Sequence, residues 1–236
     1  MGLPIYYVGG SKGGVGKSLF SLILVEYLLS KNKKVLLFDA DMQNRDLFLA
    51  FENDSGTIAT TTVDLDSSSE WLRILSFIEK HGDHHVVINS AANNTDGTLR
   101  YGPILLEGLP ELKREMFFFW LLNRQRDSLN KFSDLKRIFS SAKIFAVRNL
   151  YFGNQEKFSF FNSSSEKKEL EDNKKDNRVF DFPEMADRVA ESISNERLSI
   201  GNGIKNLSLG ERCELKRWRK LCFEVFDGIP GLQQHE

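Results

Sequence analysis

Apolar residues along the chain gather in short runs that have the length of buried β-strands. These runs predict strands over residues 4–9, 34–41, 84–90, 115–123 and 143–149. Between them, apolar residues recur at helical spacing and predict helices over residues 17–30, 68–82 and 127–140. Because strands alternate with helices, we expect an α/β fold with right-handed βαβ units, a mostly parallel central sheet and helices on both faces.

Two later segments follow other patterns. Residues 162–178 are almost wholly polar, with charges of both signs, which is typical of an exposed loop or a solvated helix. Residues 209–227 carry Leu215, Trp218 and Cys222 at helical spacing and predict a C-terminal helix that packs against the sheet. The pattern shows no internal repeat and no linker, so we expect residues 1–236 to form a single domain.

Composition adds limits on the class of protein. The 236 residues are 41% hydrophobic and 28% charged, which suffices for a substantial core. The net charge of −1 gives no global polybasic surface, so any DNA contact needs a local patch. No apolar run approaches the length of a membrane span, and the N-terminus does not resemble a secretory signal. Cys213 and Cys222 are nine residues apart in a predicted helix and cannot pair, so we expect a cytoplasmic protein.

The stretch "GGSKGGVGKSLF", residues 9–20, lies between a predicted strand and a predicted helix. Glycines in this position let successive N–H groups converge on phosphate oxygens, and the helix N-terminus adds its dipole. Lys17 is expected to reach the β- and γ-phosphates, and the Ser18 hydroxyl to bind Mg²⁺. The residues expected to bind the nucleotide here are Gly13, Gly14, Val15, Gly16, Lys17, Ser18 and Leu19. A glycine-rich turn without a ligand is the simpler alternative, and the flanking strand and helix argue against it.

The loop departs from the usual pattern G-x-x-x-x-G-K-[ST] at its first position. Ser11 stands where the first glycine is expected, and a second lysine, Lys12, follows it. This combination resembles the deviant Walker A motif of the ParA/MinD family of P-loop ATPases. The resemblance implies ATP and Mg²⁺ as cofactors and an ATP-dependent homodimer in which Lys12 reaches the partner subunit's nucleotide.

A second segment, "LLFDADMQ" at residues 36–43, resembles the D-x-D-x-Q segment of the same family. The resemblance implies that Asp39 lies near Mg²⁺ and that Asp41 orients the attacking water. Two carboxylates at i and i+2 can both face the phosphates where the strand ends and the chain turns. Lys12, Lys17 and Asp41 are thus the expected catalytic residues, and Ser18 and Asp39 the expected metal ligands. An acidic turn that merely ends the strand remains the alternative.

A third segment, "VVINSAA", breaks the family pattern. Asn89 stands where the family usually has an aspartate at the end of a strand. An asparagine can accept a hydrogen bond from a metal-bound water but brings no charge. We therefore expect nucleotide binding to tolerate this change better than rapid hydrolysis.

Recognition of the base is expected at the end of a later strand. Asn149 lies where ParA-like proteins often place an asparagine on the adenine edge. The segment "FDFPEM", residues 180–185, resembles the proline-containing loop that closes over the base in these proteins, with Pro183 at its centre. An asparagine at a strand end is also a common turn residue. Asn123 is the competing candidate for the base contact.

Within the family, three stretches resemble the plasmid StbB and TraL branch of stability and conjugal-transfer proteins: "FFFWLLNRQRDSL", "VRNLYFG" and "ERCELKRWRKLCF". The resemblance implies a slowly hydrolysing, ATP-dependent dimerisation switch in plasmid stability, partition or transfer. Its partner would be a plasmid-encoded DNA-binding or transfer protein. The alternatives are a nucleotide-binding scaffold with little hydrolysis and a P-loop kinase that acts on a small acceptor.

Two further groups of residues contain chemistry that could form a site. "HGDHH", residues 81–85, joins a predicted helix to a strand, and no further ligands complete a metal shell. The basic residues around Trp218 have the chemistry to hold DNA phosphates or a membrane surface, or they form an ordinary solvated helix face.

Overall fold

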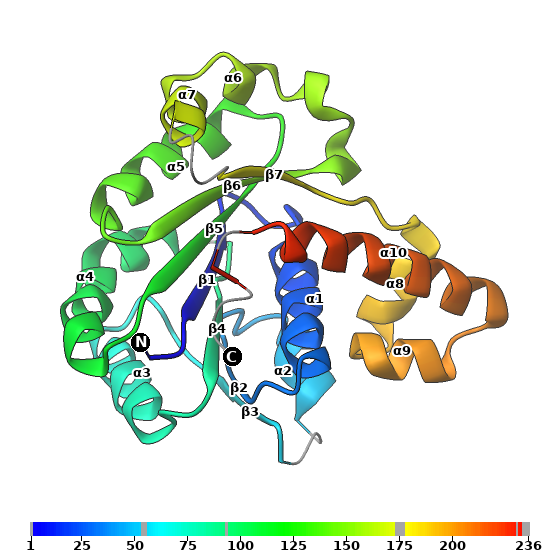
Figure 1. The fold of residues 1–236 in the computed structure, drawn as a ribbon, viewed down its shortest axis with the longest axis horizontal. Helices are drawn as coiled ribbons and strands as arrows, with labels where there is room; N and C mark the ends of the chain where they lie inside the picture. The colour runs from blue at the N-terminus through cyan, green and yellow to red at the C-terminus, as the bar shows by residue number, and fades with distance from the viewer. Residues whose placement is uncertain (1, 53–55, 93, 173–177, 230, 233–236) are drawn as a thin grey trace.

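The computed structural model describes residues 2–52, 56–92, 94–172, 178–229 and 231–232. Its centre is a seven-stranded sheet within these residues, and every neighbouring pair of strands is parallel (Figure 1). The strand order is β3-β2-β4-β1-β5-β6-β7. The strands are β1 (Ile5–Gly10), β2 (Val35–Asp39), β3 (Ile58–Thr62), β4 (His85–Asn89), β5 (Met116–Leu122), β6 (Lys143–Asn149) and β7 (Val179–Phe182). The predicted α/β fold is confirmed.

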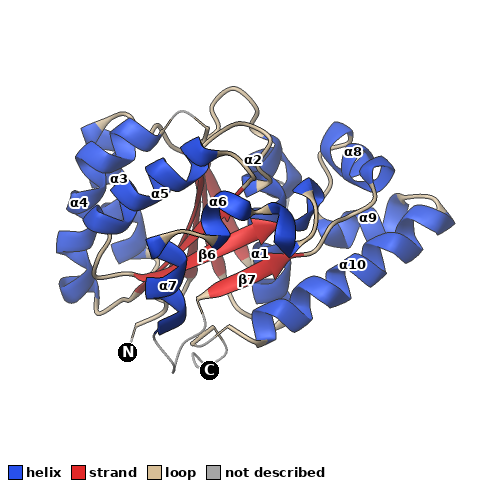
Figure 2. Cartoon of the chain, turned by 90° about the horizontal axis from the view of Figure 1, so that it is seen from above, coloured by secondary structure: helices blue, strands red, loops and turns tan. Residues whose placement is uncertain are grey.

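Helices cover both faces of the sheet (Figure 2). They are α1 (Lys17–Ser30), α2 (Asp46–Phe51), α3 (Ser68–Lys80), α4 (Thr95–Leu112), α5 (Arg126–Ile138), α6 (Ser159–Asn162), α7 (Ser165–Asp172), α8 (Asp187–Asn195), α9 (Ile200–Asn206) and α10 (Leu209–Asp227). One face packs against α1, α2 and α8–α10, and the other against α3–α7. Each face has its own hydrophobic core.

Alternation within single strands explains the two cores. In β1, Tyr6 and Val8 point into the core beneath α1, while Ile5 and Tyr7 point into the core beneath α3 and α4. Successive residues of a strand face opposite sides of a sheet, and a parallel sheet is buried on both. This is why the central strands are almost continuously apolar, as in "MFFFWLL" of β5.

Several elements differ from the sequence-based expectation. The edge strand β3 reads "IATTT", and α4 contains Pro103 and Pro110, so neither gives a clear apolar pattern. Phe180–Phe182 form part of β7, which pairs with β6, so the expected base-closing loop begins only at Pro183. The short helices α2, α8 and α9 were also not predicted.

The polar segment at residues 162–178 and the C-terminal helix are largely as expected. The polar segment contains α7, whose Leu170 is buried, and its residues 173–177 lie outside the described part of the chain. Helix α10 begins at a capping box formed by Ser208 and Glu211 and buries Trp218 against the core. Cys213 is exposed, Cys222 is buried, and both are free thiols, as their spacing predicts.

The topology places the loop after β1 at a point where connections diverge. The chain leaves β1 through α1 toward β2 on one side, whereas α4 carries it from β4 across β1 to β5 on the other. In open parallel sheets, such a switch point opens a crevice at the carboxyl ends of the strands. The candidate motifs all lie at this edge.

Candidate functional site

The glycine-rich loop joins β1 to α1, as predicted. Gly14 and Gly16 have φ values of 74° and 96°, in the left-handed region that favours glycine. A Cβ on Gly16 would also lie only 2.5 Å from Nδ2 of Asn149. Because Gly16 is the N-cap residue of α1, no side chain caps the first N–H groups of this helix. These free donors and the helix dipole form an anion-binding site.

Lys17 points back into the loop. Its side chain is buried, and its Nζ donates to the backbone oxygen of Lys12 over 3.0 Å. Burial lowers the pKa of Lys17 to about 8, against the opposing influence of the nearby Asp41 carboxylate. A phosphate in the loop would give this amine the charged partner that it lacks.

Asp39 stands at the end of β2 and is completely buried. Its Oδ1 accepts hydrogen bonds from Nδ2 of Asn89 at 3.0 Å and from the backbone N of Asp41 at 3.2 Å. Its Oδ2 accepts from the backbone N of Phe48, in α2, at 3.0 Å. Burial raises the pKa of Asp39, and these three hydrogen bonds oppose the rise. This carboxylate thus joins β2, β4 and α2.

Asn89 occupies the end of β4 and is also fully buried. Its Oδ1 accepts from the hydroxyl of Ser21, in α1, at 3.0 Å, so its Nδ2 group faces Asp39 and lies 3.5 Å from Oγ of Ser18. In this arrangement, the asparagine is a donor to the neighbouring carboxylate. Its oxygen accepts from Ser21 and keeps one further lone pair, so the expected hydrogen bond from a metal-bound water stays a prediction.

Asp41 and Lys12 lie nearer to solvent. Oδ1 of Asp41 accepts from the backbone N of Asn44 at 2.9 Å and shapes the turn before α2. Lys12 directs its side chain away from the loop: its Nζ donates to Oε1 of Gln125 at 2.8 Å and lies 3.3 Å from Oδ2 of Asp127. The Lys12 side chain is 48% exposed. The two lysines of the loop therefore point in different directions.

Of the residues expected at the base, Asn149 contacts the loop directly. Asn149 ends β6, and its Nδ2 donates to the backbone oxygen of Val15 at 3.0 Å while its Oδ1 accepts from the backbone N of Tyr151. Pro183 follows β7, and its oxygen accepts from Nε1 of Trp218 at 2.8 Å. Oδ1 of Asn123 accepts from the backbone N of Gln125 in the turn before α5. The roles of Asn149 and Asn123 in reading a base stay predictions.

The structure also adds residues that the sequence did not single out. Ser21 orients Asn89, Phe48 ties α2 to Asp39, and Gln125 and Asp127 hold Lys12. None belongs to a recognisable motif, and Lys12 and Gln125 are 113 positions apart. The position of Ser21, one helical turn after Lys17 on the buried face of α1, is the only sequence signal among them.

These residues fit a nucleotide and a magnesium ion. The buried Ser11 hydroxyl at the start of the loop has no hydrogen-bond partner in the described part of the chain, and α1 begins with free N–H groups. Ser18 and Asp39 supply oxygen atoms, the ligands that Mg²⁺ prefers, and Mg²⁺ commonly takes only one or two protein ligands beside phosphates and water.

Two histidines of the turn after α3 contact neighbouring groups of the chain. Nδ1 of His81 lies 2.8 Å from the backbone oxygen of Phe77, and Nδ1 of His84 lies 2.8 Å from Asp83. Among the described residues, no three His, Cys, Asp or Glu side chains are arranged to hold a metal ion. The helices of the described ranges likewise include none with the length and apolar character needed to cross a membrane.

Solved structures of other proteins have a similar fold. MinD from Pyrococcus horikoshii, complexed with Mg-ADP, matches with a TM-score of 0.58 at 15% identity, over 94% of this chain and 96% of that one. A Borrelia burgdorferi protein assigned to plasmid partition and bound to AMPPNP matches with a TM-score of 0.57 at 18% identity, over 95% and 100% of the two chains. At these identities, the likeness concerns the fold alone.

Comparison of sequences gives a nearer relative and a family. Protein MobD from Acidithiobacillus ferrooxidans is 38% identical over 229 residues, which cover 97% of this chain and 99% of MobD. Residues 6–200 match the model of the CobQ/CobB/MinD/ParA nucleotide binding domain. The chain belongs to this family of nucleotide-binding domains, whose MinD and ParA members are P-loop ATPases.

Proposed function

We propose that the protein is an ATP-dependent dimerisation switch. ATP and Mg²⁺ bind at the loop after β1, two subunits associate across their nucleotides, and slow hydrolysis by this Mg-dependent ATPase resets the pair. The family supports nucleotide binding, and the MinD and partition structures bound to Mg-ADP and AMPPNP support the choice of adenine nucleotide and metal.

The observation that carries this proposal is the arrangement of the two lysines. Lys17 is buried against the loop, where a phosphate of its own subunit would lie, whereas Lys12 leaves the loop and stays half exposed. The contacts of Lys12 with Gln125 and Asp127 lie at the surface, where an ion pair contributes at most about 1 kcal/mol. Lys12 is therefore free to exchange these contacts for the partner subunit's nucleotide, as in the deviant Walker A motif.

The remaining residues have distinct tasks in this proposal. Ser18 and Asp39 would hold Mg²⁺, which when bound neutralises charge on the phosphates. Asp41 lies close enough to Lys17 to influence its charge and would orient the attacking water. Asn149 and Pro183 would contact the adenine base from β6 and from the loop after β7.

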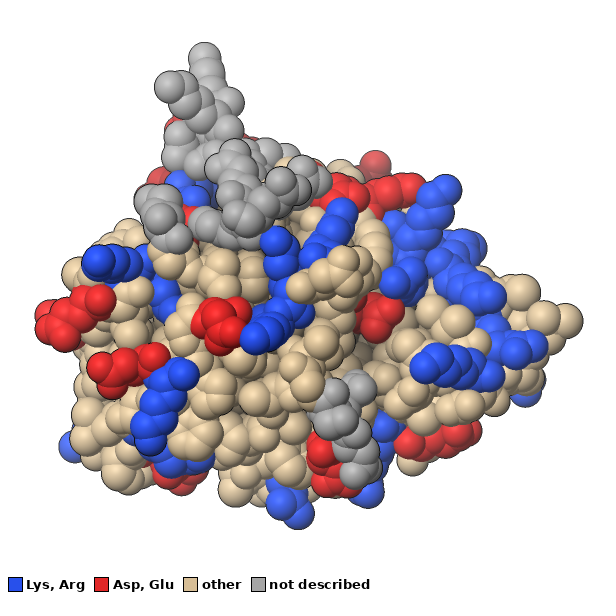
Figure 3. All heavy atoms as spheres, turned by 60° about the horizontal axis from the view of Figure 1, so that its bottom comes forward, with Lys and Arg blue, Asp and Glu red and all other residues tan. Residues whose placement is uncertain are grey.

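The proposed biological role rests on the likeness to MobD rather than on the geometry of the site. MobD is 38% identical over nearly the whole chain, and this likeness supports the proposed role in plasmid stability, partition or conjugal transfer. The partner would be a plasmid-encoded DNA-binding or transfer protein, and the StbB/TraL-like branch stays part of this proposal. Lys and Arg side chains gather over the α8–α10 part of the molecule (Figure 3), and those of α10 near Trp218 are the candidates for direct DNA contact.

A nucleotide-binding scaffold with little hydrolysis is the second candidate. Asn89 supplies no charge. Its amide group donates a hydrogen bond to the buried carboxylate of Asp39, so this carboxylate already has a partner within the site. Single-turnover phosphate release separates the two functions, because a scaffold would bind and dimerise without releasing phosphate.

Sedimentation of the Lys12→Ala variant tests the switch. With Mg²⁺ and a non-hydrolysable ATP analogue, the wild type should dimerise and Lys12→Ala should stay monomeric, while calorimetry shows nearly unchanged monomer affinity for the analogue. Lys34→Ala is the matched control, since Lys34 is an exposed lysine paired with Asp83 away from the loop. A wild type that stays monomeric at high concentration, or a Lys12→Ala variant that dimerises equally well, would refute the proposal.

A further inference from the structure

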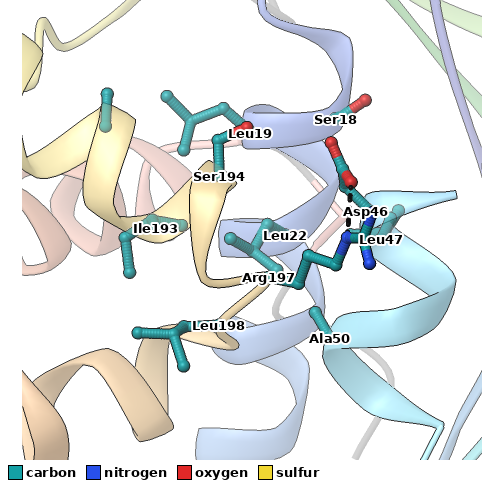
Figure 4. Close-up of a pocket in the computed structure, with 11 residues that line it drawn as sticks. Ser18, Leu19, Leu22, Asp46, Leu47, Ala50, Ile193, Ser194, Arg197 and Leu198 are labelled. Atoms are coloured by element: carbon teal, nitrogen blue, oxygen red, sulfur yellow. Dashed lines mark hydrogen bonds and ion pairs between the residues drawn. The ribbon is translucent and has the colours of Figure 1, made fainter. Parts of the chain in front are cut away.

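A cavity of about 150 Å³ lies between α1, α2, α8 and the turn after α8 (Figure 4). Most of its lining is apolar: Leu19, Leu22, Leu47, Ala50, Ala190, Ile193 and Leu198. Four polar residues complete the lining: Ser18, Asp46, Ser194 and Arg197. A cavity of roughly this volume with aliphatic walls holds a group the size of benzene, so this one is too small for a nucleotide.

Arg197 stands in an unusual backbone conformation beside this cavity. Its φ is 51°, in the left-handed region, and it follows the last residues of α8. The backbone N of Arg197 donates to Ser194 and that of Leu198 donates to Ile193, which is the hydrogen-bond pattern of a Schellman motif. Glycine is the favoured residue at this position, and an arginine there costs backbone energy. Residues in such conformations are often found at ligand-binding sites.

The side chain of Arg197 reaches from the turn after α8 across to α2, where its Nε lies 3.3 Å from Oδ1 of Asp46 (Figure 4). The Nη groups of Arg197 donate to no other residue in the described part of the chain. A guanidinium has five donors and suits the two oxygens of a carboxylate. The rim thus offers free donors for an anion above an apolar floor.

We propose that this cavity binds a small carboxylate whose body is a branched aliphatic or aromatic group of about six heavy atoms. The apolar body lies among the leucines and Ile193, and the carboxylate pairs with the Nη groups of Arg197 at the rim. A neutral amide of the same shape offers the guanidinium one uncharged acceptor, and an amine brings a positive charge, so both suit Arg197 less well than the acid.

The same cavity adjoins the nucleotide site on two sides. Ser18, the expected Mg²⁺ ligand, forms part of its wall. Asp46 begins α2, and Phe48, two residues later, donates its backbone N–H to Asp39. A carboxylate bound at the Nη groups shares the guanidinium charge with Asp46, which weakens the ion pair between α2 and the turn after α8. The ligand would therefore change Mg²⁺-dependent nucleotide affinity, and this coupling, unlike the binding itself, rests on the proposed function.

NMR titration of the nucleotide-free protein with 4-methylpentanoate tests the binding. The acid should bind about tenfold more tightly than 4-methylpentanamide or 4-methylpentylamine, because only the acid brings a negative charge to Arg197. Arg197→Gly should remove this preference while leaving the protein at least as stable, since glycine suits the left-handed position. Asp46→Asn should strengthen binding of the acid, because it removes the competing carboxylate.

Filling the cavity provides an independent check. Ala50→Leu should abolish binding of the acid and of the amide, with a thermal melt to show that the variant is folded. Equal binding of acid and amide, unchanged binding by Arg197→Gly, or tighter binding of the amine would each overturn the proposal. Since these measurements contain no ATP or Mg²⁺, a failed ATPase assignment would not affect them.

Discussion

Lys17 and Lys12 leave the same loop in different directions, and this difference separates their expected effects. Lys17 is the buried cation of the loop, so Lys17→Ala removes the charge that would face the β- and γ-phosphates. Charge-assisted hydrogen bonds contribute about 1.5 to 3 kcal/mol each, which predicts a loss of tenfold or more in ATP affinity by calorimetry. Unchanged affinity would remove the phosphate-loop assignment. Lys31→Ala, at the far end of α1, should bind ATP like the wild type.

Asn89 gives a second prediction at the residue scale. In Asn89→Asp, a carboxylate replaces the amide that donates to Asp39 over 3.0 Å, so two acidic groups face each other in a buried site. Without metal, their repulsion and the lost hydrogen bond should lower the free energy of unfolding by about 1 to 3 kcal/mol. With Mg²⁺, the added charge should raise turnover several-fold and leave ATP affinity within a few-fold.

Asn89→Ala is the control for this substitution, because it removes the same hydrogen bond without adding charge. Its turnover should stay at or below that of the wild type, and its stability should not respond to Mg²⁺ as that of Asn89→Asp does. If Asn89→Asp leaves turnover unchanged and Asp41→Ala is also without effect, hydrolysis is not the task of this site and the scaffold becomes the better account.

The sequence singles out the motif residues of the candidate site but not their partners. The loop, its two lysines and the carboxylates at the end of β2 and just after it are short-range patterns, and the structure brings them to one edge of the sheet. The hydrogen bond from Asn89 to Asp39 joins residues 50 positions apart, and the hydrogen bond from Ser21 to Asn89 joins residues 68 positions apart. Such contacts depend on strand order and on which face of α1 is buried, and spacing along the chain contains neither.

At the scale of elements, strong periodicity decides what can be predicted. The central strands and α1, α3, α5 and α10 have clear apolar patterns, and the structure places them close to the expected ranges. Two prolines interrupt the apolar pattern of α4, and β3 is an edge strand with polar threonines. Pairing with β2 holds β3 in the sheet, so tertiary context overrides a weak local signal there.

Helix α10 contacts the loop after β7 through Trp218. Nε1 of Trp218 donates to the oxygen of Pro183, the residue that begins the expected base-closing loop. Trp218→Phe keeps an aromatic ring in the core but loses this bond, which should lower the free energy of unfolding by about 1 to 3 kcal/mol. If the loop closes over adenine, ATP affinity should fall several-fold in calorimetry while affinity for tripolyphosphate stays constant.

Trp71 in α3 offers a matched control on the other face of the sheet. It is fully buried, and its Nε1 donates to the backbone oxygen of Leu65 at 2.9 Å. Trp71→Phe should cost similar stability and leave the ratio of ATP to tripolyphosphate affinity unchanged. Equal ratios in the two variants would show that the loop after β7 does not recognise the base.

At the scale of the whole molecule, the topology brings the separate motifs to a common edge. The loop follows the central strand, Asp39 and Asn89 end β2 and β4 on one side, and Asn149 ends β6 on the other. Helix α5 follows β5 and carries Asp127 to the surface beside the loop, where it meets Lys12. Association of two subunits would therefore begin from a state in which Lys12 is held by its own chain.

This arrangement predicts the direction of change when Asp127 loses its charge. Asp127→Asn weakens the surface contact that holds Lys12, so less energy is needed to move the lysine toward a partner subunit's nucleotide. Because an exposed ion pair contributes about 0.2 to 1 kcal/mol, dimerisation with Mg²⁺ and a non-hydrolysable ATP analogue should strengthen by roughly two- to thirtyfold when both subunits carry the change.

Asp134→Asn is the control, since Asp134 lies on the same helix and pairs with Arg137 instead. Sedimentation velocity over a range of concentrations measures both variants. Equal dimerisation of Asp127→Asn and Asp134→Asn would show that the contact does not restrain Lys12, and weaker dimerisation of Asp127→Asn would place Asp127 itself in the interface.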